Sequence, residues 1–256
     1  MTITLDFRDL VAFLLALARA GAWLVVVPPF ANRQSVPPVV TVAIAVGLSL
    51  LVAPLVPVDQ LPVAVPGLLG SLVVQVVTGA AMGYVVSLLL STFSTAGGFV
   101  DLMGGLNLPP SIDPLGLDQS ATMGQFFNQV AMVLLFVSGG YLVMVEGFAR
   151  SFQMPAMTLA STSLLTRILI VDLATFFLSA LEITAPLLVV LFATQIVLAL
   201  LTKAAPQLNV WLLGMPLQIF LSLIIVGLGI AVVPGSLATI VTRAVHDALG
   251  FLTARP

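Results

Sequence analysis

The 256-residue sequence contains no cysteine and a single histidine, His246. Without cysteine, the chain can form no disulfide bond, no thiolate metal site and no cysteine nucleophile. A single imidazole also excludes metal sites that need two or more histidine ligands. We therefore expect neither a metal nor a cofactor to be bound.

Charged residues are also scarce. Lys and Arg together number 8 and Asp and Glu 10, so 7% of the chain is charged while 60% is hydrophobic. An average soluble domain is about 25% charged, and 18 charged side chains cannot cover a water-soluble globule of this size. The formal net charge of −2 offers no basic surface for a phosphate backbone, so no nucleic-acid partner is expected. The composition predicts a membrane protein whose surface contacts lipid.

Long gaps between charged residues outline the membrane segments. No Asp, Glu, Lys or Arg occurs in 34–58, 60–100, 119–145, 183–202 and 204–242. A helix needs about 20 apolar residues to cross the hydrocarbon core, and these runs lack the alternation of membrane-barrel strands. The predicted fold is therefore all-α and polytopic, built of helical hairpins in one domain over 1–256. The expected segments are 9–27, 39–57, 68–94, 125–147, 164–202 and 209–233.

The fifth segment is too long for one crossing. Pro186 divides 164–202 into two halves of about 20 residues, which indicates either a kinked helix or a hairpin. Basic residues normally collect in cytoplasmic loops, yet six simple crossings would leave them on both sides. Either this segment is a hairpin, or some of the helices are not ordinary spans.

Residues 97–120 form the longest stretch predicted to be non-helical. This stretch contains Gly104-Gly105, Pro109-Pro110 and Asp113-Pro114, which are turn-forming pairs. Connections of this length are uncommon unless they are functional or disordered. Its apolar residues indicate an ordered loop that packs against something.

Both ends of the chain carry weaker signals. Two acids, Asp6 and Asp9, flank Arg8 before the first apolar run, whereas a secretory signal begins with basic residues, so the first segment is expected to be retained. At the other end, 236–252 shows apolar residues at helical spacing and is predicted to form an amphipathic helix. His246 is expected on the polar surface of this helix.

Acidic residues at membrane depth are candidates for function. Glu146 precedes Arg150 by four positions, the favourable order for a helical ion pair, and we predict that pair. Asp172 and Glu182 lie inside the fifth segment. They support an alternative function, a stand-alone secondary transporter or ion channel in which they carry protons or ions.

Two further patterns indicate helix packing. The amides of Gln125, Asn128 and Gln129 share one helix face, where they would form hydrogen bonds to other helices. Gly79 and Gly83 form a small-xxx-small pair that lets two helix backbones approach closely. No GxSxG, HExxH or P-loop sequence is present, so a membrane-bound enzyme is the least favoured hypothesis.

A series of short motifs runs along nearly the whole chain. In order, they are Arg19-x-Gly21, Pro28-x-Phe30, Val36-Pro37, Ala96-Gly97-x-x-x-Asp101-x-x-Gly104, Asp113-Pro114, Ser151-Phe152-x-x-Pro155, Ala185-Pro186 and Pro206-Gln-Leu-Asn-Val-Trp211. In this order they resemble the FliR family, the R subunits of the flagellar type III export gate, which are related to the SctT family of injectisomes. The chain departs from that pattern at Gly139-Gly-Tyr141, where Asn-Gly-His is usual, at Leu208 and at Trp211.

The resemblance implies a non-enzymatic function. Proteins of this family form, with FliP and FliQ subunits, a pore in the bacterial inner membrane at the flagellar basal body. That pore meets FlhB and FlhA, and unfolded flagellar proteins pass through it. The loop within 97–120 resembles the family's plug, which closes the pore. Its residues here would be Leu106, Leu108, Pro109, Pro110, Ile112, Asp113, Pro114, Leu115 and Leu117. Pro206, Gln207 and Asn209 are expected to take part in helix packing, with Gln207 and Asn209 forming hydrogen bonds to backbone at a helix junction.

Overall fold

The computed structural model describes residues 7–28, 30–31, 36–56, 65–105, 122–153, 162–204, 210–230 and 233–253. Every regular element in these ranges is helical. The α-helices are α1 Phe7–Val26, α2 Pro38–Val52, α3 Val65–Leu90, α4 Thr92–Gly104, α5 Thr122–Val137, α6 Gly140–Arg150, α7 Thr162–Ala204, α8 Val210–Gly229 and α9 Val233–Thr253. Two short 3₁₀ helices, η1 Ala53–Leu55 and η3 Ser151–Gln153, follow α2 and α6.

Several of these helices are long and apolar enough to cross a membrane. Within the described residues they are Phe7–Val26, Pro38–Leu55, Val65–Gly104 and Ile170–Ala204, and there are up to six spans if each of two bent helix pairs counts as one. A helix satisfies its backbone polar groups internally, as the hydrocarbon core requires. The chain is therefore an all-α polytopic membrane protein, as its composition predicts.

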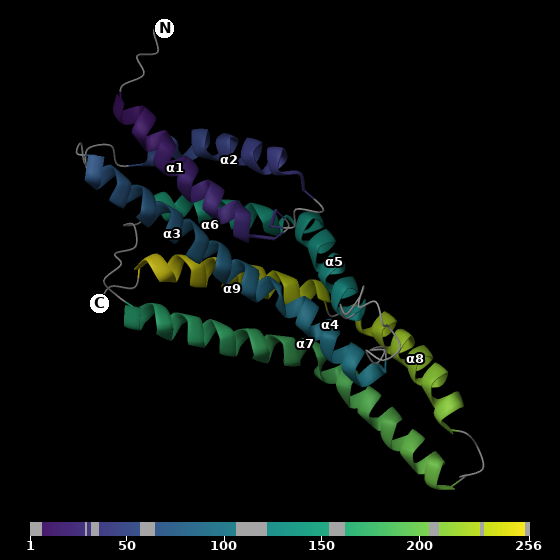
Figure 1. Ribbon diagram of the computed structural model, residues 1–256. Coiled ribbons are helices and arrows are strands. Elements are labelled where there is room, and N and C mark those ends of the chain that lie inside the picture. Colours follow the sequence, from purple (N-terminus) through teal and green to yellow (C-terminus); the bar gives the residue numbers. More distant parts are fainter. Residues whose placement is uncertain are drawn as a thin grey trace, which may run out of the picture. The chain divides into compact units, whose positions relative to one another are not determined.

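The fifth predicted segment is a single helix. Figure 1 shows α7 as one continuous ribbon, and Pro186 lies inside it. The hairpin alternative is therefore wrong for this segment. Proline removes one backbone hydrogen bond and crowds the preceding turn, but membrane helices tolerate it because neighbouring groups satisfy the freed carbonyl.

Two other boundaries differ from those expected. Residues 97–104, predicted to be non-helical, belong to α4, because Gly97 serves close packing rather than a turn, as its contacts below show. The predicted segment 125–147 is two helices, α5 and α6. The break falls at Gly139, whose φ of 73° is a left-handed conformation that glycine adopts without a steric penalty.

The chain forms two compact units, each assembled from separate stretches. The first unit covers 1–90, 139–173 and 240–256, and the second covers 91–138 and 174–239. In the first, α1 packs on both α2 and α3 (Figure 1). Its core includes Leu24 and Trp23 of α1.

In the second unit, α4 packs along α5 and also contacts α8. Figure 1 shows α8 returning beside the distal part of α7. The side chain of Leu187 on α7 reaches Gly229 at the end of α8, where any added Cβ would collide with it. The end of α4 contacts helices from a distant part of the sequence, α7 and α8.

Candidate functional site

The candidate site lies where the chain leaves α4 and where it enters α5, both in the second unit. The last four carbonyls and first four N–H groups of a helix have no partner within that helix. Burying such groups without a hydrogen bond costs free energy, and lipid supplies no water to replace one. Side chains of other helices satisfy these groups here.

Asp101 on α4 caps the start of α5. Its carboxylate is fully buried, with 0% exposure, and Oδ2 accepts hydrogen bonds from the backbone N–H groups of Met123 at 2.9 Å and Gly124 at 3.1 Å. Both groups belong to the first turn of α5. A carboxylate suits this position because hydrogen bonds to a charged acceptor are strong and because the helix N-terminus carries positive partial charge.

Gly97 allows this contact to form. It lies one turn before Asp101 on α4, and a Cβ built on it would collide with the carbonyl oxygen of Met123 and lie 2.5 Å from the carbonyl carbon. Only glycine lets the backbones of α4 and α5 come so close. The pair at positions i and i+4 therefore brings the Asp101 carboxylate within hydrogen-bond distance of the α5 amides.

The end of α4 is held by side chains from two other helices. Gln195 of α7 and Gln218 of α8 each donate from Nε2 to the carbonyl oxygen of Met103, both at 2.8 Å. The Oγ of Ser222 on α8 lies 3.2 Å from the carbonyl oxygen of Gly104 and 2.7 Å from that of Gln218 on its own helix, and its single hydrogen is shared between these two acceptors. The two glutamine bonds satisfy the Met103 carbonyl, one of those that the end of the helix leaves free.

Gly105 ends α4 in a left-handed conformation with φ of 69°. Its N–H donates to the carbonyl of Asp101, as in a helix C-cap. A Cβ at this position would lie 3.1 Å from the amide carbon of Gln218. The direction in which the chain leaves α4 is thus fixed by glycine geometry and by the packed Gln218 side chain.

Several predicted site residues lie outside the described residues. They are the plug residues Leu106, Leu108, Pro109, Pro110, Ile112, Asp113, Pro114, Leu115 and Leu117, and the junction residues Pro206, Gln207 and Asn209. The contacts above hold the helices on either side of 106–121. The candidate site is therefore the pair of helix ends on either side of the predicted plug.

The predicted amide face of α5 lies away from the contact with α4. Gln125 and Gln129 are exposed, and Asn128 is half-buried. The buried positions of α5 are Met123, Gly124, Phe127, Ala131 and Leu135. Sequence reasoning missed the roles of Asp101, Gln195, Gln218 and Ser222. The sequence did contain a signal for these roles: Asp101 is a lone acid one turn after a glycine, and Gln195 and Gln218 are single amides inside apolar runs.

A second polar centre lies in the first unit around Arg19 of α1. This side chain is buried and donates from Nη1 to the carbonyl oxygen of Ser151 at 2.8 Å and from Nε to Oε1 of Gln75 at 2.5 Å. Its guanidinium carbon lies 4.4 Å from the centre of the Phe152 ring. Two of the motifs that carried the resemblance, Arg19 and Ser151-Phe152, therefore meet in space although they are 132 positions apart.

Aromatic rings and glycines complete this centre. Trp23 stacks on Phe148 with ring centroids 4.7 Å apart, and Phe148 meets Phe152 edge-on at 5.3 Å. Gly79 of α3 lies against the backbone of Arg19, and Gly83 lies against the backbone of Trp23. The small-xxx-small pair thus faces α1 and lets α1 and α3 pack backbone to backbone.

The acidic residues have contrasting surroundings. Asp172 is buried and its Oδ2 has no hydrogen-bond partner among the described residues, whereas Glu182 is exposed. Glu146 and Arg150 form an ion pair of 2.6 Å. Both of these side chains are exposed, and such pairs add at most about 1 kcal/mol to stability. His246 is exposed, and the described residues contain no cluster of three His, Asp or Glu side chains that could bind a metal.

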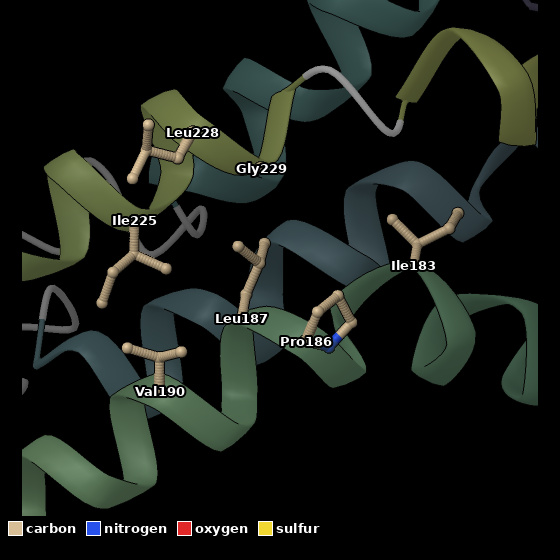
Figure 2. A pocket seen from close by; sticks show the side chains of 7 residues that line it. All are labelled: Ile183, Pro186, Leu187, Val190, Ile225, Leu228 and Gly229. Carbon is tan, nitrogen blue, oxygen red and sulfur yellow. The ribbon is translucent and has the colours of Figure 1, made fainter.

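An apolar groove runs between α7 and α8 in the second unit. Figure 2 shows its lining, which consists of side chains around Pro186 on α7 and the last turns of α8 up to Gly229. Its volume is about 310 Å³, and every lining residue is apolar. None of the lining residues has a hydrogen-bonding or ionisable side chain.

Known proteins match this chain over most of its length. Residues 10–244 match the family described as bacterial export proteins, family 1. The chain belongs to this family. The match covers α1 from residue 10 onward and all of α2 to α8, including the Arg19 centre and the ends of α4 and α5.

The curated relatives within this family carry two kinds of name. Flagellar biosynthetic protein FliR of Bacillus subtilis is 25% identical over 223 residues, 83% of each chain, and that of Escherichia coli is 26% identical over 194 residues, 75% of this chain and 74% of its own. Surface presentation of antigens protein SpaR of Shigella flexneri is 24% identical over 152 residues, 59% of each chain. The predicted FliR resemblance is confirmed, and the chain is a membrane-embedded component of a flagellar or type III export apparatus.

Proposed function

We propose that this family member is a non-enzymatic subunit of the flagellar export gate in the bacterial inner membrane. With FliP and FliQ subunits it forms the pore through which unfolded flagellar proteins cross, and FlhB and FlhA are its further partners at the basal body. The observation that carries the proposal is the family match over residues 10–244, together with FliR relatives aligned over about four-fifths of the chain.

The length of the apolar surface on α7 supports a subunit rather than a solitary protein. Ile170 is 62% exposed and Leu201 is 47% exposed, and at 1.5 Å per residue they lie about 45 Å apart along the helix. The hydrocarbon core is about 30 Å thick, and even a helix tilted by about 40° crosses it in about 39 Å. The hydrocarbon core alone does not span this whole apolar face, so part of it is available for contact with sister subunits.

Purification from the membrane tests the assembly. A gate subunit should emerge in a stable complex with other small hydrophobic proteins, which mass spectrometry would identify as FliP and FliQ. The alternative, a stand-alone transporter using Asp172 and Glu182, requires a well-behaved single protein that binds a solute. Isolation of the chain alone, with solute binding lost in the Asp172→Asn variant, would contradict the proposal.

The segment bracketed by α4 and α5 is the proposed plug. Its residues Leu106–Leu117 are rich in leucine and proline, which suit a loop that fills a pore and excludes water and ions. The helices on both sides are fixed by Asp101, Gln195 and Gln218.

Removing this plug should make the gate leak. Deletion of residues 106–117 is expected to raise the conductance of the purified complex to small ions while leaving its subunit composition unchanged. The measurement is release of K⁺ trapped in proteoliposomes. A second variant keeps the length and replaces Leu106, Leu108, Ile112, Leu115 and Leu117 by serine; it should leak as well, because a polar loop admits water. Unchanged conductance in both variants would contradict the plug.

A further inference from the structure

Glu182 interrupts an exposed apolar face of α7. Its side chain is exposed, and no other charged residue occurs between Asp172 and Lys203. Leu178, one turn before it, is 61% exposed, and Val189, two turns after it, is 69% exposed. Residues at these spacings share one side of a helix. A single carboxylate therefore lies within a long apolar surface that the rest of the chain leaves open.

The carboxylate of Glu182 has no cationic partner in the part of the chain that the structure describes. The ion pair of Glu146 with Arg150 and the contact of His246 with Asp247 both lie on other helices. The next base along α7 is Lys203, about 32 Å away at 1.5 Å per residue. An acid on an apolar face is therefore left without a counter-charge from its own surroundings.

Pro186 leaves a second acceptor at the same turn. In an α-helix the carbonyl of residue 182 would accept the N–H of residue 186, but proline has none. The hydroxyl of Thr184 donates instead to the carbonyl of Ala180, at 2.7 Å. This turn of α7 therefore presents a carboxylate and a carbonyl that lacks its helical donor. A lysine ammonium or an arginine guanidinium carries several N–H donors and could serve both.

The length of the face indicates that protein, rather than lipid, covers Glu182. Exposed apolar residues extend from Ile170, about 18 Å before Glu182, to Leu201, about 28 Å after it. If the hydrocarbon core includes Glu182, its carboxylate lies at a depth where acids rarely face lipid and are usually paired. If the core lies wholly on one side of Glu182, the exposed apolar residues on the other side lie outside it, and such a surface marks a protein contact.

We infer that the exposed face of α7 around Glu182 binds an apolar helix of a sister subunit, and that this helix carries a lysine or arginine opposite Glu182. The inference rests on the proposed function, which supplies the sister subunits. A second copy of this chain is a poor occupant, because a two-fold pairing through this face would bring Glu182 against its own copy. The partner is therefore a different chain, and the charge pair fixes its position along α7.

The first experiment measures how much complex is purified from equal amounts of membrane. Glu182→Lys should lower the yield about tenfold or more, because two cations then meet at a site closed to water. Glu182→Gln should lower it less, and Glu182→Asp, which keeps the charge, should lower it least. Glu146→Lys is the matched control. It makes the same change at an exposed acid whose partner lies on its own helix, and its yield should stay within about twofold.

The second experiment identifies the partner helix. The photo-crosslinking amino acid p-benzoylphenylalanine replaces Leu178, which is large, apolar and exposed on the same face, so that Glu182 itself is unchanged. After irradiation of the purified complex, mass spectrometry should find the cross-link in an apolar segment of a sister subunit, within about one helical turn of a lysine or arginine. Replacing that base by glutamate should then restore the yield of the Glu182→Lys complex.

The outcomes separate this inference from the proposed function. If the unchanged chain purifies without sister subunits, the proposed function fails. If the complex forms and Glu182→Lys assembles as well as Glu146→Lys, only the inference is overturned. Cross-links confined to lipid or to a second copy of the chain would also overturn it. So would a Glu182→Lys defect that no exchanged charge on the cross-linked segment restores, since the residue would then serve folding of its own chain.

Discussion

Asp101→Leu is expected to lower the free energy of unfolding of the chain by about 3 kcal/mol, or roughly a hundredfold in the ratio of folded to unfolded protein. Leucine removes the acceptor of both α5 amides, so the N–H groups of Met123 and Gly124 lose their side-chain partner at a buried site. Asp101→Asn keeps one oxygen acceptor without the charge and should lose about half as much.

Thermal unfolding of the purified complex in detergent measures this effect. The control is Asp9→Leu, which removes an acid from an exposed position near the start of α1. That variant should unfold close to the unchanged protein, because no buried amide depends on Asp9. If Asp101→Leu unfolded at the same temperature as the control, the hydrogen bonds from Asp101 to the α5 amides would contribute nothing to stability.

Gly79→Ala should disrupt the first unit even though it adds a single methyl group. The new Cβ would collide with the backbone carbonyl oxygen of Arg19 and lie 3.1 Å from its carbonyl carbon. Backbone cannot rotate away as a side chain can, so α1 must shift from α3. Such a shift also disturbs the bonds from Arg19 to Gln75 and Ser151. The expected cost is about 1–3 kcal/mol, the usual range for overpacking.

Gly70→Ala is the matched control because it makes the same change in the same helix. Nothing lies within 4 Å of a Cβ at Gly70, which is exposed. Alanine is the better helix former by up to about 1 kcal/mol, so this variant should be equally or more stable. Steady-state amount in the membrane and thermal unfolding in detergent compare the two. Equal stability of both variants would contradict the close contact of α1 with α3.

Some of these contacts could be predicted from spacing along a helix. The Glu146–Arg150 pair and the Gly79–Gly83 face are separated by four residues, and helix geometry alone places each pair on one side. Gly97 and Asp101 have the same spacing, but the sequence around them does not predict that Met123 is their partner. The hydrogen bonds of Arg19 to Ser151 and of Gln195 to Met103 span 132 and 92 positions. Such partners depend on which helix faces meet.

The helix boundaries, too, could be predicted only in part from the sequence. Pro186 left the fifth segment open as a kinked helix or a hairpin, and α7 passes through it as one helix. Gly97 and Gly104 suggested a loop, but both lie within α4. Glycine and proline mark turns in water because the freed backbone groups find solvent there. In an apolar setting the helix keeps its internal bonds, and glycine instead admits a neighbouring backbone.

The sequence by itself determined that this protein is an all-helical membrane protein, because hydrophobicity and scarcity of charge are sums over local stretches of chain. Its motifs also indicated the export family to which it belongs. Only the tertiary structure decided that Asp101 caps α5, that Gln195 and Gln218 share one carbonyl, and that Arg19 is held by Ser151. Each of those bonds joins helix ends or faces that meet only after packing, so no local pattern contains them.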